Sequence, residues 1–186
     1  EKPSLRTRVS FDVGLNKLGG HGVYLDQQGC GFGQRETVKD FAENLSCWCD
    51  AIVARVFSHD DLQELAKYAQ VPVINALSDL YHPCQALADV LTLSEHFSDL
   101  TKVKLAYVGD GNNVVHSLML ASAILGIQLT VITPPGRAPA PEVIEQAQAL
   151  TSESGRLILT QDIDEVVDHH AIYTDTWLSM GDSTPI

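Results

Sequence analysis

Two hydroxyl groups and two guanidinium groups lie within five residues near the start of the chain. The segment Ser4–Arg8 reads Ser-Leu-Arg-Thr-Arg and comes directly before a stretch with helical spacing. Amides at the start of a helix carry partial positive charge, and hydroxyl and guanidinium groups donate further hydrogen bonds to phosphate oxygens. The segment therefore predicts an anion-binding turn, while an ordinary helix cap with solvated arginines explains the same residues about equally well.

A second polar cluster, His82-Pro83-Cys84-Gln85, follows an apolar run and precedes another helical stretch. A histidine at such a turn can donate a hydrogen bond to a ligand carbonyl, and Gln85 offers a donor and an acceptor to a ligand amide. Pro83 fits the first turn of a helix, where its missing N–H is not needed. The cluster predicts a site for a carbonyl compound, although a lone histidine is more often structural.

Two further clusters each follow an apolar run. Residues 109–113 read Gly-Asp-Gly-Asn-Asn, but a dinucleotide fingerprint would require glycine where Val114 stands. The two asparagines suit a polar, amino-acid-like ligand, or they simply form a turn. Asp175 can neutralise a ligand ammonium group, and Ser179 lies four residues later in a loop that could wrap a small substrate; alternatively, Asp175 caps a helix.

Short apolar runs alternate with helical patterns along the whole chain, which is typical of parallel sheets covered by helices. The expected strands are residues 22–25, 51–56, 71–75, 103–108, 129–132, 156–159 and 171–173. The expected helices are residues 8–18, 37–49, 60–69, 85–97, 114–125, 142–150 and 163–167. We expect Leu87, Val90, Leu91 and Phe97 to form the apolar face of the helix 85–97.

This pattern predicts an α/β protein of two domains, each with a central parallel sheet flanked by helices, and an active site in the cleft between them. The expected boundaries are a first domain at residues 1–84, a linking helix at 85–100 and a second domain at 101–186. Because the chain runs from Glu1 straight into motif-like sequence without an initiator Met, we expect both domains to be incomplete.

Composition excludes several classes of protein. The 186 residues carry a net charge of -12, which argues against general binding to nucleic acid or anionic membranes. No apolar run approaches the roughly 20 residues of a membrane-spanning helix, and no secretory signal is visible. The four cysteines, Cys30, Cys47, Cys49 and Cys84, follow neither a metal-binding nor a disulfide-rich spacing, which predicts reduced thiols in the cytoplasm.

Taken together, these segments resemble the aspartate/ornithine carbamoyltransferase family. The segments at 4–8 and 82–85 are similar to its carbamoyl phosphate motifs, and the resemblance runs along nearly the whole chain in the same order. The segment Asp-x-Trp-x-Ser-Met-Gly at 175–181 resembles the acceptor loop of members that use ornithine rather than aspartate.

The resemblance assigns roles to particular residues. Those implied to bind carbamoyl phosphate are Ser4, Leu5, Arg6, Thr7, Arg55, His82, Pro83, Cys84 and Gln85, and Arg6, Arg55 and His82 are implied to be catalytic. Those implied to bind ornithine are Asn113, Asp175, Ser179 and Met180. Leu5 stands where the family commonly has Thr, so one hydroxyl is lost, and Gly31 stands near a position where some members use Gln for the phosphate.

The implied reaction transfers the carbamoyl group of carbamoyl phosphate to the side-chain amine of ornithine, which gives citrulline and phosphate for arginine biosynthesis. It implies no metal, no organic cofactor and a homotrimer. The family's His-Cys-Leu-Pro segment and a later arginine would fall after Ile186, so we expect little or no activity from the chain alone.

Three alternatives stay open on the sequence. A sister carbamoyltransferase could use acetylornithine or putrescine, since it would share the phosphate motifs and differ in the acceptor loop. A noncatalytic fragment could bind carbamoyl phosphate without reaction. A nicotinamide-dependent dehydrogenase is the weakest alternative, because its glycine pattern fails at Val114.

Overall fold

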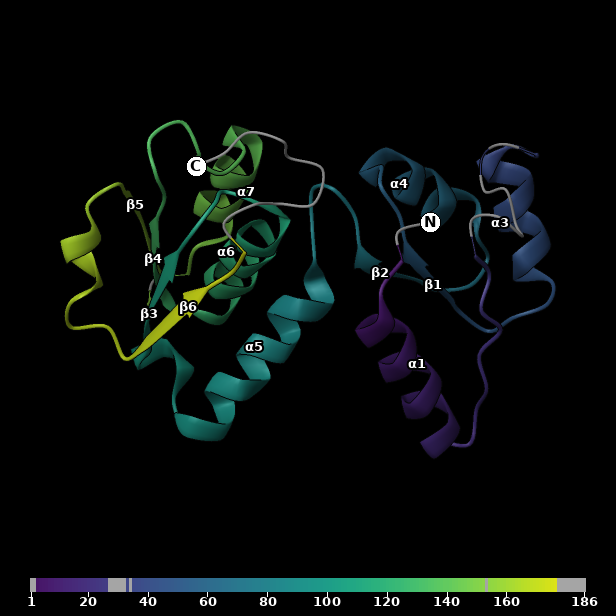
Figure 1. Ribbon diagram of the computed structural model, residues 1–186, viewed down its shortest axis with the longest axis horizontal. Coiled ribbons are helices and arrows are strands. Elements are labelled where there is room, and N and C mark those ends of the chain that lie inside the picture. The colour runs from purple at the N-terminus through teal and green to yellow at the C-terminus, as the bar shows by residue number, and fades with distance from the viewer. Residues whose placement is uncertain (1–2, 27–32, 34, 153, 177–186) are drawn as a thin grey trace. The chain divides into compact units, whose positions relative to one another are not determined.

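The computed structural model describes residues 3–26, 33, 35–152 and 154–176 (Figure 1). Contacts divide the chain into two compact units, Glu1–Asp79 and Leu80–Ile186. The first unit contains α1 (Leu5–Lys17), α3 (Val38–Ser46), β1 (Ile52–Arg55), α4 (His59–Tyr68) and β2 (Val73–Leu77). The second contains α5 (Pro83–His96), η1 (Leu100–Lys102), β3 (Lys104–Val108), α6 (Asn113–Leu125), β4 (Gln128–Ile132), α7 (Pro141–Leu150), β5 (Arg156–Thr160), η2 (Ile163–Val166) and β6 (Ala171–Thr174).

In the first unit, β1 and β2 pair in parallel, and α3 and α4 pack on them. Both helices begin at a capping hydroxyl, because Thr37 accepts from the amide of Asp40 and Ser58 accepts from the amide of Asp61. The buried core consists of Val38, Ala42, Ile52, Ala54, Val56, Leu62 and Leu65. This small core holds β1 in place, and with it Arg55 at the end of that strand.

In the second unit, four parallel strands pair in the order β5-β4-β3-β6. Their apolar side chains pack with α5, α6 and α7 in one core, and the short η2 lies near β4. The chain moves outward from β3 to β4 and β5, and then returns to the other side of β3 as β6. The carboxyl ends of β3 and β6 are therefore neighbours at a switch point, where open α/β sheets usually bind their ligands.

The predicted strands from 51–56 onward and the predicted helices are confirmed, with boundaries that differ by a few residues. The expected strand at 22–25 is wrong, since residues 21–26 have no regular structure and expose Val23, Tyr24 and Leu25. Without a neighbouring strand, a short apolar run has no partner for its backbone groups. Apolar composition alone was a poor guide there.

The expected apolar face of α5 is also partly wrong. The helix packs with the second unit through Ala86 and Leu93, which are buried, whereas Leu87 and Leu91 are exposed by 65% and 61% in the described chain. The buried face is thus rotated from the predicted one. It brings Asp89 to a half-buried position instead of a solvated one.

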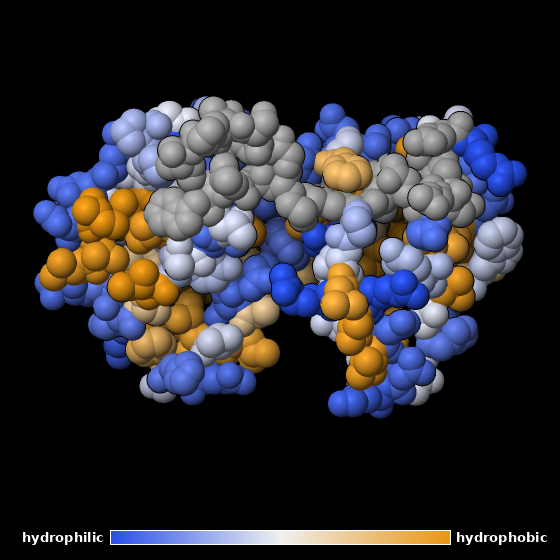
Figure 2. Space-filling model, viewed as in Figure 1, coloured by the Kyte–Doolittle hydropathy of each residue, from blue (hydrophilic) through white to orange (hydrophobic). Residues whose placement is uncertain are grey.

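Helix α1 carries an uncovered apolar row. Leu5, Val9 and Val13 recur every four residues, so they lie along one side of the helix, and each is about half exposed or more. Figure 2 shows hydrophobic side chains along this helix. None of the helices in the described ranges is both long and apolar enough to cross a membrane.

Candidate functional site

The predicted anion-binding cluster of the first unit lies at the first turn of α1. The helix begins at Leu5, three residues before the predicted start, because the hydroxyl of Ser4 accepts from the amide of Thr7 at 3.3 Å. The amides of a first helical turn have no partner within the helix, so they can serve an anion. The loss of a hydroxyl at Leu5 leaves its backbone amide in this turn, and Arg6 is exposed beside it.

Arg55 comes from the end of β1 and meets this turn. Its Nη1 lies 3.5 Å from Oγ1 of Thr7, 48 residues away in the sequence. A bulge helps to aim it: Ala54 pairs with Asn75, but Arg55 pairs with Leu77, so the register shifts by one residue directly before the arginine. Burial lowers the pKa of Arg55, yet a guanidinium remains charged at neutral pH. The structure thus gathers a cation, a hydroxyl and helix amides.

Arg8 takes a different direction from this cluster. Its guanidinium lies 4.1 Å from the centre of the Tyr24 ring, a cation–π contact. That contact holds the irregular segment 21–26 against α1. Arg8 therefore has a packing role in the structure, whereas Arg55, a residue far away in sequence, supplies the second charge near Thr7.

The His82–Gln85 cluster starts α5 in the second unit. His82 is the residue before the helix and Pro83 is its first residue. The backbone N–H of His82 donates to Oγ of Ser117 at 2.8 Å and lies 3.2 Å from the carbonyl of Asn113. Burial raises the pKa of Cys84, so its thiol stays protonated and is a poor nucleophile. The first two turns of α6 therefore fix the start of α5.

His116 ties the same region together and was missed by sequence reasoning. Its Nδ1 lies 2.9 Å from the carbonyl of Leu80, and its Nε2 accepts from the amide of Ala140 at 3.0 Å. Both contacts together require the neutral ring, protonated at Nδ1. Burial lowers the pKa of His116, which favours this neutral form. The signal in the sequence was a His-Ser pair inside an otherwise apolar helix.

The side-chain amide nitrogen of Gln85 faces Asp89 on the same helix, α5. Nε2 donates to Oδ1 of Asp89 at 2.9 Å, one helical turn later. Burial is the main cause that raises the pKa of Asp89, and the negative charge of Asp175 raises it further. Two acidic side chains from α5 and from the end of β6 are therefore close enough to interact.

Asp175 follows β6, and Asn112 follows β3. These strands pair so that Val108 lies opposite Thr174. Nδ2 of Asn112 donates to Oδ2 of Asp175 at 3.1 Å, while Oδ1 of Asn112 accepts from the amides at the start of α6. Asn113 is the first residue of α6. Ser179 and Met180, like Gly31, lie outside the described residues.

The glycines of the 109–113 loop serve internal packing. A Cβ at Gly111 would lie 2.4 Å from backbone atoms of Ala138 and Pro139, and a Cβ at Gly109 would lie 3.0 Å from the Tyr107 hydroxyl. Backbone of the proline-rich loop at residues 134–141, between β4 and α7, thus packs directly against Gly111. This argues against a dinucleotide site, in agreement with the failed glycine pattern. No three His, Cys, Asp or Glu side chains gather as a metal group in the described part of the chain.

Comparison with known proteins matches both units. A family model described as the carbamoyl-P binding domain of aspartate/ornithine carbamoyltransferase matches residues 1–95, and the corresponding Asp/Orn binding domain matches residues 101–185. The chain belongs to the aspartate/ornithine carbamoyltransferase family.

Individual members of the family are closely similar. Ornithine carbamoyltransferase of Shewanella oneidensis is 64% identical to this chain. The match includes 100% of this chain and 62% of that protein. The solved ornithine carbamoyltransferase of Pyrococcus furiosus is 52% identical with a TM-score of 0.93, over 97% of this chain and 58% of that one. A solved N-acetyl-L-ornithine transcarbamylase is 30% identical with a TM-score of 0.85, over 95% of this chain and 63% of that one. The chain thus spans about 60% of the length of such relatives.

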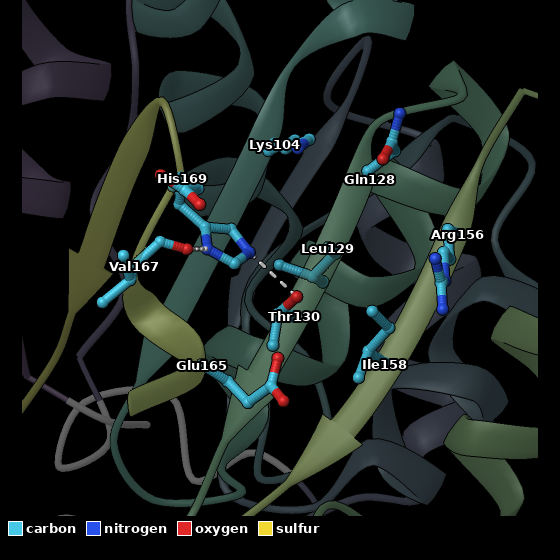
Figure 3. A pocket seen from close by; sticks show the side chains of 10 residues that line it. Lys104, Gln128, Leu129, Thr130, Arg156, Ile158, Glu165, Val167 and His169 are labelled. Atoms are coloured by element: carbon cyan, nitrogen blue, oxygen red, sulfur yellow. Dashed lines mark hydrogen bonds between the residues drawn. The ribbon is translucent and has the colours of Figure 1, made fainter. Parts of the chain in front are cut away.

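A polar pocket of about 220 Å³ lies elsewhere in the second unit. Lys104, Gln128 and Arg156 line it, and each is the first residue of its strand, so the pocket is at the amino ends of β3, β4 and β5. Figure 3 shows His169 in this pocket, with its ring bonded to Thr130 at 2.9 Å. The pocket shares no residue with the family's predicted site, which lies at the opposite ends of the strands.

Proposed function

We propose that the protein carrying this chain transfers the carbamoyl group of carbamoyl phosphate to the side-chain amine of L-ornithine, which gives L-citrulline and phosphate. The observation that carries the proposal is the approach of Arg55 to Thr7 in the first turn of α1. A residue of the Ser4–Arg8 segment and a residue that the family resemblance selects, 48 positions apart in the sequence, are neighbours there. The names of the most similar relatives support ornithine as the acceptor.

In this proposal the first unit binds the phosphate group. Amides of Leu5 and Arg6 donate from the helix start, while the amide of Thr7 is held by the cap at Ser4, and the hydroxyls of Ser4 and Thr7 donate beside them. The guanidiniums of Arg6 and Arg55 neutralise the charge that grows on the phosphate as the C–O bond breaks. These two positive charges stabilise the transition state more than the ground state, because the leaving group gains negative charge as the bond breaks.

The second unit acts on the carbamoyl group. His82 donates to the carbonyl oxygen, which becomes negative when the amine attacks, and Gln85 contacts the carbamoyl NH2 group. Pro83 and Cys84 hold these two side chains at the start of α5. The reaction forms an N–C bond between the neutral amine and the carbonyl carbon, the phosphate departs with the electrons of the C–O bond, and the amine nitrogen loses a proton. No metal or organic cofactor takes part.

Ornithine recognition is assigned to Asn113, Asp175, Ser179 and Met180. The carboxylate of Asp175 has a fixed direction because Asn112 donates to it, and a fixed carboxylate orients an ammonium group well. Asp89 adds negative charge nearby. This pairing of acidic groups favours a substrate with a free ammonium group.

The experiment is an acceptor comparison in the full-length protein. Purified protein is supplied with carbamoyl phosphate and, in turn, ornithine, acetylornithine, putrescine and aspartate, and the carbamoylated product is measured. Ornithine should give the highest kcat/KM by at least about tenfold, as expected when one charged group is recognised. A preference for acetylornithine or putrescine would replace ornithine in the proposal.

A noncatalytic carbamoyl phosphate-binding fragment is the second candidate, supported by the match of residues 1–95 to a carbamoyl-P binding domain. Binding of carbamoyl phosphate by the 186-residue chain without citrulline formation would support it. The full-length protein would then be expected to show the activity that the shorter chain lacks.

The cellular setting belongs to the same proposal. We assign the reaction to arginine biosynthesis in the cytoplasm, and Cys47, Cys49 and Cys84 form no disulfide among the described residues, which suits a reducing compartment. The homotrimer rests on the family resemblance. Self-association would cover apolar surface such as the exposed row on α1. Sedimentation of the full-length protein tests it.

A further inference from the structure

Asp89 and Gln85 form a side-chain pair one turn apart on α5. Nε2 of Gln85 donates to Oδ1 of Asp89 at 2.9 Å. An ionised carboxylate only accepts hydrogen bonds, so the amide nitrogen of Gln85 must face Asp89 and its oxygen must face away. The orientation of the glutamine amide is therefore set by its neighbour.

Helix stability does not explain an aspartate at this position. Asp89 lies in the middle of α5, where aspartate is a poor helix former, and none of the ion pairs of the described residues includes it. Its second oxygen, Oδ2, is buried and has no hydrogen-bond partner among those residues. Leaving such an oxygen without a partner is unfavourable. The hydrogen bond from Gln85 is therefore the interaction that can explain an aspartate at this position.

We propose that Asp89 is a positioning residue that fixes the Gln85 amide with its oxygen directed to the ligand, so that Gln85 selects a donor bearing an NH2 group. This rests on the proposed function, in which Gln85 meets the carbamoyl group. An outward oxygen accepts from the NH2 group of carbamoyl phosphate. Acetyl phosphate has the same phosphate and carbonyl groups, but its methyl group cannot donate a hydrogen bond to the Gln85 oxygen.

The test measures equilibrium binding of carbamoyl phosphate and of acetyl phosphate to the full-length protein by calorimetry. In Asp89→Asn the new side chain both donates and accepts, so the Gln85 amide can turn over. The variant should bind carbamoyl phosphate about tenfold more weakly and acetyl phosphate within about twofold of wild type. Glu95→Gln, which removes a charge from an exposed position of the same helix, is the matched control and should change neither affinity.

A double-mutant cycle separates positioning from a general structural effect. If Asp89 acts through Gln85, then Asp89→Asn should cause no further loss of carbamoyl phosphate affinity in a Gln85→Ala background. Asp89→Ser, which cannot reach Gln85, is a second variant and should repeat the selective loss. An equal loss for both ligands, or a further loss without Gln85, would overturn the proposal.

The outcome for wild type distinguishes this inference from the proposed function. If wild type binds carbamoyl phosphate but forms no citrulline, the proposed reaction is overturned. The role of Asp89 is then decided by the two binding affinities alone. Protein that binds neither ligand overturns both. Protein that forms citrulline while Asp89→Asn keeps the wild-type ratio of the two affinities overturns only the role of Asp89.

Discussion

Asn112 and Asp175 are 63 residues apart in the sequence, and their side chains are joined by a hydrogen bond of 3.1 Å. The same asparagine caps α6, since its oxygen accepts from the amides of Val114 and Val115. The cap fixes which end of the amide faces Asp175. One residue therefore couples the start of a helix to the direction of a proposed substrate-binding carboxylate.

Asn112→Asp separates these two roles. Aspartate is as good a helix cap as asparagine, so the contribution of the cap to the free energy of unfolding should be retained. Its carboxylate cannot donate to Asp175 and repels it, so KM for ornithine should rise about tenfold or more. Asn112→Ala is the comparison, and it should also lower the free energy of unfolding by about 1 kcal/mol. An unchanged KM in Asn112→Asp would show that the bond to Asp175 does not serve ornithine.

Arg55→Ala tests the phosphate cluster. Loss of a partly buried charge beside Thr7 should lower kcat and raise KM for carbamoyl phosphate, so that kcat/KM for carbamoyl phosphate falls about 100-fold, while KM for ornithine should change far less. Arg156→Ala removes an exposed arginine at the start of β5 and is the control, with wild-type kinetics expected. Steady-state kinetics of the full-length protein provide the measurement. Saturation by carbamoyl phosphate at wild-type concentrations would remove Arg55 from the site.

The strands of the second unit could be predicted because each is a short, almost continuous apolar run, as buried parallel strands require. The meeting of Arg55 with Thr7 could not, because it depends on a bulge that shifts the register of β1 against β2. No local pattern in the sequence reports which strand carries an extra residue. Family resemblance, rather than spacing, selected Arg55 beforehand.

The positioning residues were harder to predict than the residues they position. The sequence drew attention to the asparagine pair but assigned the ligand to Asn113, while the structure bonds Asn112 to Asp175. Asp89 was missed because the apolar face of α5 was placed over Leu87 and Leu91, which are exposed. A helical face depends on what packs against it, and a single sequence does not contain that information.

His116 predicts a pH-dependent stability. Its pKa is lowered in the folded protein, chiefly by burial, so below about pH 6.5 the unfolded chain binds a proton that the folded chain resists. Wild type should therefore lose stability as pH falls through this range. His116→Gln lacks this effect, so the stability difference between the two proteins should narrow from pH 8 to pH 5.

The control for this titration is His96→Gln, at an exposed position of α5. Urea unfolding of the three proteins at each pH provides the measurement, and His96→Gln shows the effect of removing an exposed histidine. At pH 8, His116→Gln should be less stable than wild type by about 1 to 3 kcal/mol, since Ala140 and Leu80 lose a buried partner. A gap that widens toward pH 5 would contradict the neutral histidine.

Gly111→Ala tests whether the glycines of the β3–α6 turn serve packing. The new Cβ would lie 2.4 Å from backbone atoms of Ala138 and Pro139, which cannot yield without moving the proline-rich loop. We expect a loss of about 2 to 3 kcal/mol in the free energy of unfolding. Gly109→Ala is the matched control two residues earlier, where the nearest atom is the Tyr107 side-chain hydroxyl at 3.0 Å, and it should cost about 1 kcal/mol or less. A larger loss of stability in Gly109→Ala than in Gly111→Ala would mean that the Tyr107 side chain, rather than the backbone at residues 138–139, excludes a Cβ from this turn.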